Sequence, residues 1–254
     1  MSDSNSNSIL RTEGLTRKFG ALVAVNDVSI DVPRGQVRAI IGPNGAGKTT
    51  LLDLIINKTH PTSGTVWFNG EDISSKSTPA IANRGLCKCF QISQVFGNLD
   101  VFENVRIPLI NRHKSVMNVL PRGENYLKDE VLHMLSYVGM EDKLHEVANN
   151  LSYGDKKRLE VAMTLAMRPS LIFLDEPTAG VARAEGYEFM KLIRNLVENE
   201  NMTIVFIEHD MDIVWNYADE ISVMSLGSLI ATGTPVEIKN NEFVQKAYLG
   251  GDEL

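Results

Sequence analysis

The chain has very little cysteine and no long apolar run. Cysteine occupies only 2 of the 254 positions, Cys87 and Cys89, which excludes a framework of disulfide bonds. The five histidines form no cluster at the spacing of a zinc site, so we interpret the two cysteines as structural. No stretch approaches the ~18 consecutive apolar residues that predict a membrane-spanning helix. These absences indicate a reduced, intracellular globular protein without a membrane span of its own.

The chain also lacks an excess of positive charge. Its formal net charge is −7, with 25 lysines and arginines against 32 aspartates and glutamates. A protein that binds DNA or RNA by neutralising many phosphates needs the opposite balance, so we expect no nucleic-acid partner. The opening residues, MSDSNSNS, lack the charged-then-apolar order of a secretory signal. We expect residues 1–8 to form a disordered tail.

Short β-rich runs alternate with helical patterns along the rest of the chain. The runs lie at residues 28–32, 37–41, 65–68, 171–175, 203–208 and 221–224. Two of them, LIFLD and TIVFIE, are continuously apolar, as expected for strands of a parallel sheet with helices on both faces. The sequence therefore predicts an α/β fold.

Two apolar stripes have helical spacing. They consist of Leu159, Ala162, Met163 and Ala166, and of Phe189, Leu192, Ile193 and Leu196. Residues 92–168 show helical periodicity without strand runs, interrupted by the polar segments NRHKS and PRGEN. We predict that this segment is a helical insertion.

Residues 40–50, IIGPNGAGKTT, match the phosphate-binding pattern G-x-x-x-x-G-K-[ST] between an apolar run and an apolar helical pattern. Glycines let backbone N–H groups surround phosphates at a helix N-terminus. Lys48 can reach the β and γ phosphates, and Thr49 can ligate Mg²⁺. A GTPase would need Asn-Lys-x-Asp, but NKTH carries His60 at the aspartate position. The predicted nucleotide-binding residues of the loop are Gly42, Asn44, Gly45, Gly47, Lys48, Thr49 and Thr50.

Two adjacent acids, Asp175 and Glu176, end the run LIFLD. At the C-terminal end of a parallel strand, both can face a ligand in the crevice. Asp175 is suited to hold Mg²⁺ through its water shell, and Glu176 to accept a proton from an attacking water. The alternative is a solvated helix cap before Pro177. The phosphate loop in the same chain favours the catalytic interpretation.

Residues 151–155 read LSYGD, and Ser152 lies 23 positions before Asp175. Together with the phosphate loop, LIFLDEP and IEHD, this motif resembles the signature of the ATP-binding-cassette (ABC) ATPases, and the resemblance covers residues 9–250. It implies a P-loop NTPase core with a mostly parallel sheet, an antiparallel β subdomain and an inserted α-helical subdomain. We expect the β subdomain and P-loop core over 9–91, the helical signature subdomain over 92–168, and the remaining core with a C-terminal helix over 169–254.

The resemblance also implies ATP and Mg²⁺ as ligands, with roles for individual residues. Phe19 sits where the family stacks an aromatic ring on adenine. Gln91 matches the catalytic-site glutamine that touches Mg²⁺, and His209 matches the histidine that contacts the γ-phosphate. Ser152 and Gly154 match the signature residues that bind the γ-phosphate of a nucleotide held by an opposite subunit. As local sequence, Ser152 fits a plain helix N-cap equally well.

Three positions depart from the commoner family pattern. The usual signature is LSGGQ, whereas this chain has Tyr153 and Asp155. Ala182 replaces an aspartate that communicates between the two sites in many relatives. These departures leave the coupling across a dimer open, but not the nucleotide binding.

The segments LSYG, EPTAGV, IEHDMDIV and the ending VQKAYLGG resemble the ATPases of branched-chain amino acid importers and their amide or urea relatives. This resemblance implies a second ATPase subunit, identical or different, and polytopic permeases docking near Val95–Val105. It also implies an extracytoplasmic solute-binding protein and a cytoplasmic position, peripheral on the inner face of the cell membrane. Lipopolysaccharide-exporter ATPases share a similar tail, and a soluble ABC ATPase switch without a transporter is the other alternative.

Overall fold

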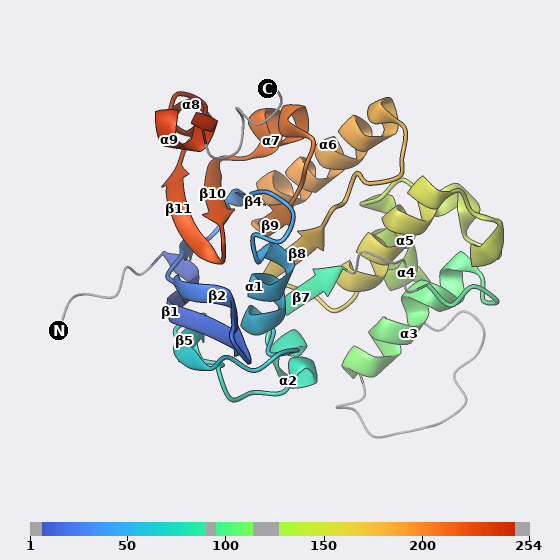
Figure 1. Ribbon diagram of the computed structural model, residues 1–254. Helices are drawn as coiled ribbons and strands as arrows, with labels where there is room; N and C mark the ends of the chain where they lie inside the picture. The colour runs from blue at the N-terminus through green and yellow to red at the C-terminus, as the bar shows by residue number, and fades with distance from the viewer. Residues whose placement is uncertain (1–6, 90–94, 114–126, 247–254) are drawn as a thin grey trace.

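The computed structural model describes residues 7–89, 95–113 and 127–246 (Figure 1). The strands are β1 (Ser8–Phe19), β2 (Leu22–Val28), β3 (Asp31–Pro33), β4 (Val37–Ile41), β5 (Ser63–Phe68), β6 (Glu71–Asp72), β7 (Leu86–Cys89), β8 (Leu171–Asp175), β9 (Thr203–Ile207), β10 (Glu220–Ser225) and β11 (Ser228–Gly233). The helices are α1 (Lys48–Ile55), α2 (Thr78–Ala82), α3 (Val101–His113), α4 (Lys128–Ser136), α5 (Tyr153–Leu165), α6 (Arg183–Glu200), α7 (Met211–Tyr217), α8 (Pro235–Lys239) and α9 (Glu242–Val244). Two short 3-10 turns cover Glu141–Lys143 and Ala148–Asn150.

The strands form two sheets. The larger sheet has the order β11-β10-β4-β9-β8-β7, in which β11 is antiparallel to β10 and the other neighbours are parallel. The second sheet is antiparallel, with the order β2-β1-β5-β6 and with β3 paired to β1. The predicted α/β class, with a mostly parallel core and an antiparallel β part, is therefore confirmed.

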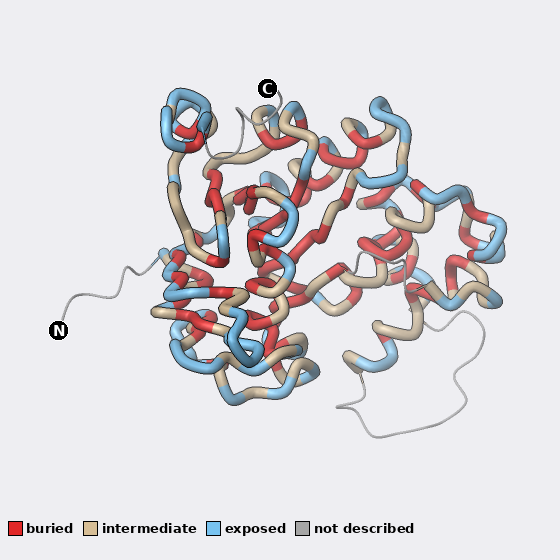
Figure 2. Tube along the Cα trace, in the orientation of Figure 1, coloured by how far each residue is buried: buried red, intermediate tan, exposed pale blue. Residues whose placement is uncertain are grey.

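The parallel sheet separates two apolar cores. Leu171 and Phe173 of β8 belong to the core that contains α1 and the antiparallel sheet, so α1 packs between the two sheets. Ile172 and Leu174 belong to the core formed with α3 to α7. Figure 2 shows that buried residues follow the central strands. Every position of β8 and β9 is buried, which confirms the interpretation of their continuous apolar runs.

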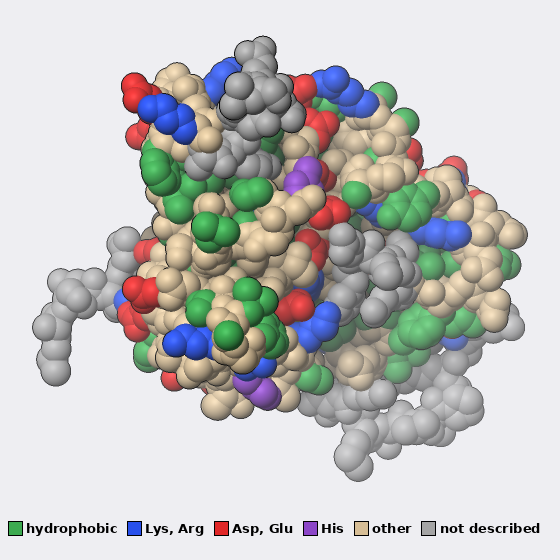
Figure 3. Space-filling view, in the orientation of Figure 1, with side chains coloured by type: hydrophobic (Ala, Val, Ile, Leu, Met, Phe, Trp, Pro, Cys, Tyr) green, Lys and Arg blue, Asp and Glu red, His purple; other side chains and the backbone are tan. Residues whose placement is uncertain are grey.

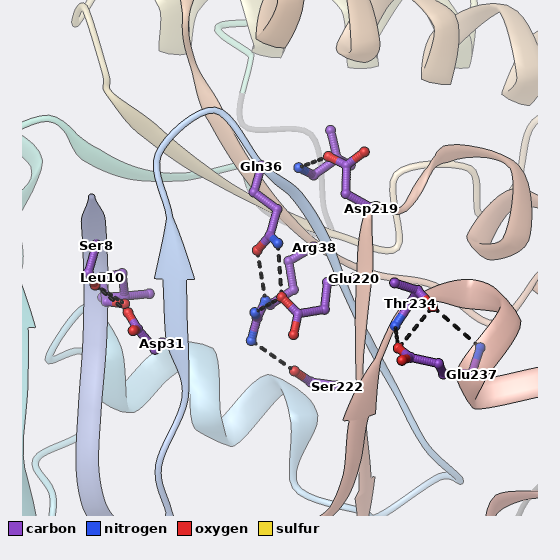
Figure 4. A network of polar contacts seen from close by, with 11 residues as sticks. Ser8, Leu10, Asp31, Gln36, Arg38, Asp219, Glu220, Ser222, Thr234 and Glu237 are labelled. Atoms are coloured by element: carbon purple, nitrogen blue, oxygen red, sulfur yellow. Dashed lines mark hydrogen bonds and ion pairs between the residues drawn. The ribbon is translucent and has the colours of Figure 1, made fainter. Parts of the chain in front are cut away.

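A buried arginine fixes the register between β4 and β10. Arg38 lies opposite Glu220 and forms an ion pair with it, while Ser222 accepts a hydrogen bond from the same guanidinium at 3.3 Å (Figure 4). Gln36 donates to Glu220 at 2.9 Å and accepts from Arg38 at 3.2 Å. Because the charges of this buried group are paired and hydrogen-bonded, a shift of one residue between the strands would break the contacts that Arg38 and Gln36 make with Glu220 and Ser222.

Both cysteines are buried free thiols on β7. Burial raises the pKa of Cys87 to about 11 and raises the pKa of Cys89 further. Cys89 Sγ lies 3.2 Å from the hydroxyl of Thr164 on α5. The thiols therefore stay protonated at neutral pH and pack β7 against its neighbours, as the structural interpretation expects.

The predicted strand at 28–32 is wrong in its bounds, because β2 ends at Val28 and β3 begins at Asp31. The hydroxyl of Thr12 on β1 donates to Val28 O at 3.0 Å and accepts from Ile30 N at 3.0 Å. Ser29 Oγ accepts from Gly14 N at 2.9 Å. These side-chain hydroxyls, together with the backbone bond from Thr12 N to Ile30 O at 2.9 Å, hold the connection between β2 and β3 against β1.

The segment predicted as a helical insertion contains α3, α4 and α5, and its described residues contain no β-strand. The subdomain bounds 9–91, 92–168 and 169–254 stay predictions. Residues 1–6 of the expected tail lie outside the described residues, and Ser8 already belongs to β1. Among the described residues, we find no helix with the length and apolar character needed to cross a membrane.

Candidate functional site

The phosphate loop, residues 42–49, connects β4 to α1 under two close backbone contacts. A Cβ on Gly42 would lie 2.2 Å from the carbonyl oxygen of Met224 on β10. Gly47 has φ 96°, and a Cβ there would lie 2.3 Å from Ala24 O on β2. Only glycine fits these positions, because any side chain would push β2 or β10 away from the loop.

Lys48 is a buried cation inside this loop. Its Nζ donates to the carbonyls of Gly42 at 2.7 Å and Pro43 at 3.0 Å. Burial lowers the pKa of Lys48, while the nearby carboxylates of Glu176 and Asp175 oppose that shift. The ammonium is therefore held where α1 begins, with its charge facing two acids at the end of β8.

A cavity of about 540 Å³ opens beside the loop. Its lining brings together most of the residues that the sequence predicts to bind nucleotide: Phe19, Asn44, Gly45, Gly47, Lys48, Thr49, Thr50, Glu176 and His209. Figure 3 shows a histidine side chain beside acidic side chains near the centre of the face drawn there. Apolar side chains also line the cavity, among them Leu22, which pairs with Phe19, and Leu226. The lining thus combines apolar side chains suited to a flat apolar ring with loop residues suited to phosphates.

Glu176 and His209 meet because their strands are neighbours. Asp175 pairs with Ile207 in the parallel register of β8 and β9, and each strand continues into one of the two residues. His209 Nε2 lies 3.2 Å from Glu176 Oε1. Glu176 has φ 52°, a left-handed conformation that is unusual for a residue other than glycine. Such strain is frequent at functional sites, where the surrounding structure enforces it.

Asp175 is buried and only partly satisfied. Its Oδ2 forms an ion pair with Lys88 Nζ at 3.1 Å, and Lys88 also reaches Asp53 of α1 at 2.9 Å. Among the described residues, no hydrogen-bond partner contacts Asp175 Oδ1. An orphaned buried carboxylate oxygen fits a ligand that brings donors or positive charge, such as the hydration shell of Mg²⁺.

Two family models match the sequence. One, described as ABC transporter, covers residues 25–179, and the other, described as Branched-chain amino acid ATP-binding cassette transporter, covers residues 228–253. The chain belongs to the ABC transporter family. As an ABC ATP-binding subunit, it is an ATPase. The region matched over residues 25–179 contains the phosphate loop, the signature and the two acids.

Curated ABC relatives match this subunit from end to end. The high-affinity branched-chain amino acid transport ATP-binding protein LivG of Salmonella typhimurium is 35% identical over 96% of this chain and 99% of its own. BraF of Pseudomonas aeruginosa, described in the same words, is 36% identical with the same coverage. The solved structure of the ADP conformation of MJ1267, an ATP-binding cassette of an ABC transporter, superposes with a TM-score of 0.84. It is 31% identical and covers 96% of this chain and 99% of that one.

The signature residues of the ABC subunit lie apart from the cavity lining, at the start of α5. Ser152 is the N-cap of that helix, since its Oγ accepts from Asp155 N at 3.1 Å and donates to Asp155 Oδ2 at 2.8 Å. A Cβ on Gly154 would lie 1.6 Å from Glu185 Oε1, so a larger residue there would require the flexible Glu185 side chain to move. The structure confirms the local N-cap interpretation of Ser152 and leaves its oxygen exposed.

The unusual acid of the signature is neutralised. Burial disfavours the charged form of Asp155, but its ion pair with Lys143 and its hydrogen bond from Ser152 outweigh that effect and lower its pKa. Lys143 therefore supplies a charge that compensates the acid at this position of the signature.

Other predicted residues have different outcomes. Gln91 lies outside the described residues. Within Val95–Val105, the side chains of Val101, Phe102 and Val105 are buried, whereas Phe96 is 47% exposed. Phe96 lines an apolar groove of about 560 Å³ between β7 and the helices α2, α3 and α5.

Sequence reasoning missed two lysines that contact the acids of this site: Lys88 pairs with Asp175, and Lys157 donates to the carbonyl oxygen of Glu176 at 3.2 Å. Lys88, in GLCKCFQ, stands between two apolar cysteines, and that unusual placement is its only signal. Lys157, in the polar run DKKR, gives no signal that distinguishes it from a solvated helix face.

Proposed function

We propose that two copies of this chain, or this chain and a similar one, close around two ATP molecules to power the import of branched-chain amino acids or related small amides. The observation that carries ATP hydrolysis is the single cavity that joins Lys48 of the phosphate loop to Glu176 and His209. The substrate class is supported by full-length similarity to LivG and BraF and by the family match over residues 228–253.

Hydrolysis uses the residues at the ends of β4, β8 and β9. The Lys48 ammonium exchanges its loop carbonyls for the β and γ phosphates, and Phe19 stacks on adenine. Glu176 accepts a proton from the attacking water. The water oxygen meanwhile bonds to the γ-phosphorus, and the bond from that phosphorus to ADP breaks. His209, 3.2 Å from Glu176, orients that carboxylate and contacts the γ-phosphate.

Mg²⁺ fits the donors present, and Thr49, Asp175 and Gln91 would hold it. The ion would neutralise charge on the phosphates during transfer. The support for this proposal is the orphaned, buried Oδ1 of Asp175 and the position of Thr49 in the cavity wall.

The second half of each site comes from the partner subunit. Ser152 and Gly154 do not line the cavity. Ser152 nevertheless places its hydroxyl at the N-terminus of α5, and both groups are suited to an anion. Placed opposite the phosphate loop of another chain, they would bind its γ-phosphate. Dimer closure on ATP thereby drives the attached permeases.

The permeases dock on the apolar groove, to whose lining the predicted segment Val95–Val105 contributes Phe96. Through them the chain sits in the cytoplasm at the inner face of the membrane, and an extracytoplasmic solute-binding protein delivers the substrate. The groove supports this proposal because its lining is predominantly apolar and open at the surface, as a recognition site for a partner helix requires.

The replacement Glu176→Gln tests the hydrolytic assignment. We expect the variant to bind ATP with nearly unchanged affinity and to turn over at least ~10²-fold more slowly, because the amide cannot accept the proton. Phosphate release and the affinity for a fluorescent ATP analogue measure the two properties. Unchanged turnover would contradict the role of Glu176.

Reconstitution with the cognate permeases in proteoliposomes tests the transport proposal. ATP inside the vesicles should drive uptake of labelled leucine, isoleucine or valine, or of urea and short amides, when the solute-binding protein is supplied on the opposite side. The Glu176→Gln variant is the control for ATP-driven flux. Efflux in place of uptake would favour an exporter, and a failure to bind any permease would favour a soluble switch.

A further inference from the structure

The segment that follows β8, residues 176–181, carries Glu176 in its left-handed conformation. We call this segment the catalytic loop. Glu176 N donates to Ile207 O at 3.0 Å, which ties the start of the loop to β9. Ala179 N donates to Glu176 O at 3.2 Å, and this turn leaves several carbonyls directed toward α5. The direction of the Glu176 side chain therefore depends on what holds these carbonyls.

Lys157 of α5 holds three of them. Its Nζ donates to the carbonyl oxygens of Glu176 at 3.2 Å, Pro177 at 2.7 Å and Ala179 at 2.8 Å. A lysine ammonium has three protons, so its donors match these three acceptors one for one. Lys157 is half-buried, and burial lowers its pKa against the opposing effect of three nearby glutamates, Glu208 first.

A buried carboxylate holds the same loop through its N–H side. Glu208, 3% exposed at the end of β9, accepts from Thr178 N at 2.8 Å and from the Thr178 hydroxyl. The other oxygen of Glu208 accepts from His209 N at 2.9 Å. The loop therefore lies between a cation from α5 and an anion from β9, and removal of either would release one side of a strained turn.

The same helix carries the signature. Ser152 caps α5, and Lys157 lies five residues further along. The Lys157 ammonium lies 5.1 Å from the centre of the Tyr153 ring, and that ring would contact a Cβ on Gly180 of the catalytic loop at 3.1 Å. A displacement of the α5 start would thus reach the loop through both side chains.

We propose that Lys157 is a positioning residue for hydrolysis, which aims the Glu176 carboxylate by fixing the carbonyls of the catalytic loop and links it to the helix that begins at the signature. This inference rests on the proposed role of Glu176 as the base. A lysine that only stabilises the fold would change the free energy of unfolding without a specific effect on the chemical step.

The test compares Lys157→Met with Lys156→Met and Lys157→Arg. Lys156 precedes Lys157 on α5, and its Nζ donates to Asn149 O at 3.2 Å, away from the loop. We expect Lys157→Met to lower kcat on the order of 10-fold with KM for ATP within about 2-fold, because misplacement of a catalytic group acts on the chemical step. Lys156→Met should leave both parameters within about 2-fold. Lys157→Arg, which keeps the charge and the donors, should recover a substantial part of kcat.

The second readout is a double-mutant cycle with Glu176→Gln, measured by single turnover of labelled ATP. Once the base is absent, Lys157→Met should cause no further loss of rate, although it should lower the melting temperature equally in both backgrounds. A full additional 10-fold loss in the Glu176→Gln background, or a wild-type kcat for Lys157→Met, would overturn the inference. If Lys157→Met does not fold, Lys157→Gln and Lys157→Arg undergo the same cycle.

The two proposals fail in distinguishable ways. A Glu176→Gln variant that hydrolyses ATP at the normal rate would reject the base itself. A slow Glu176→Gln variant beside a wild-type-like Lys157→Met variant would reject only the positioning role.

Discussion

At the scale of single residues, the site contains buried charged side chains that connect different elements of the fold. Lys88 on β7 contacts Asp53 on α1 and Asp175 on β8, and its side chain is 5% exposed. The carboxylate of Asp175 is 2% exposed. Removing one partner of a buried ion pair leaves the other charge buried and uncompensated, so the Asp175 carboxylate depends on Lys88 for its compensating charge.

Replacement of Lys88 by methionine should therefore lower the free energy of unfolding by roughly 3 kcal/mol, because it leaves the Asp175 carboxylate buried without its cation. Lys58→Met is the matched control. Lys58 pairs with the same Asp53 at 3.6 Å, but its side chain is 53% exposed, and such a pair contributes about 0.5 kcal/mol or less. Urea denaturation of the three proteins measures the difference. Equal losses in the two variants would show that Asp175 does not depend on Lys88.

At the scale of elements, the sequence predicted the strands whose burial leaves a pattern. β4 and β8 have the predicted bounds, and β9 differs by one residue, because strands covered on both faces are apolar at every position. β1 was missed although it has 12 residues. The start of β1 pairs with β3 and its end with β2, while β5 pairs with its middle, and polar residues and register shifts interrupt its alternation.

The same distinction applies to the site. The phosphate loop and the pair Asp175 and Glu176 are contiguous motifs, so their residue types and spacing were enough to predict them. The bonds of Lys157 depend on how α5 packs against a loop about 20 positions later, and an exposed lysine on any helix has the same sequence pattern. The apolar stripe at Phe189, Ile193 and Leu196 was predictable because a helix face needs only local spacing.

At the scale of the whole molecule, the phosphate loop and the signature lie on different parts of one chain. The cavity beside the phosphate loop contains neither Ser152 nor Gly154 in its lining. Under the proposed function, a single chain presents two half-sites, and two chains in opposite orientation would complete both of them with the same pair of surfaces. ATP would then be buried between subunits and would hold them together until it is hydrolysed.

This arrangement predicts that Glu176→Gln forms a dimer with ATP, at twice the 28.1 kDa mass of one chain, and returns to the monomer when ATP is removed. Adding Ser152→Asp should abolish that dimer, because a carboxylate would face the γ-phosphate of the partner's nucleotide. Ser152→Asn should retain much more of it, since aspartate and asparagine cap a helix equally well and differ here in charge. Light scattering after size-exclusion chromatography measures the mass. If the two Ser152 variants dimerise equally, the signature does not face a phosphate, and α5 is only a capped helix.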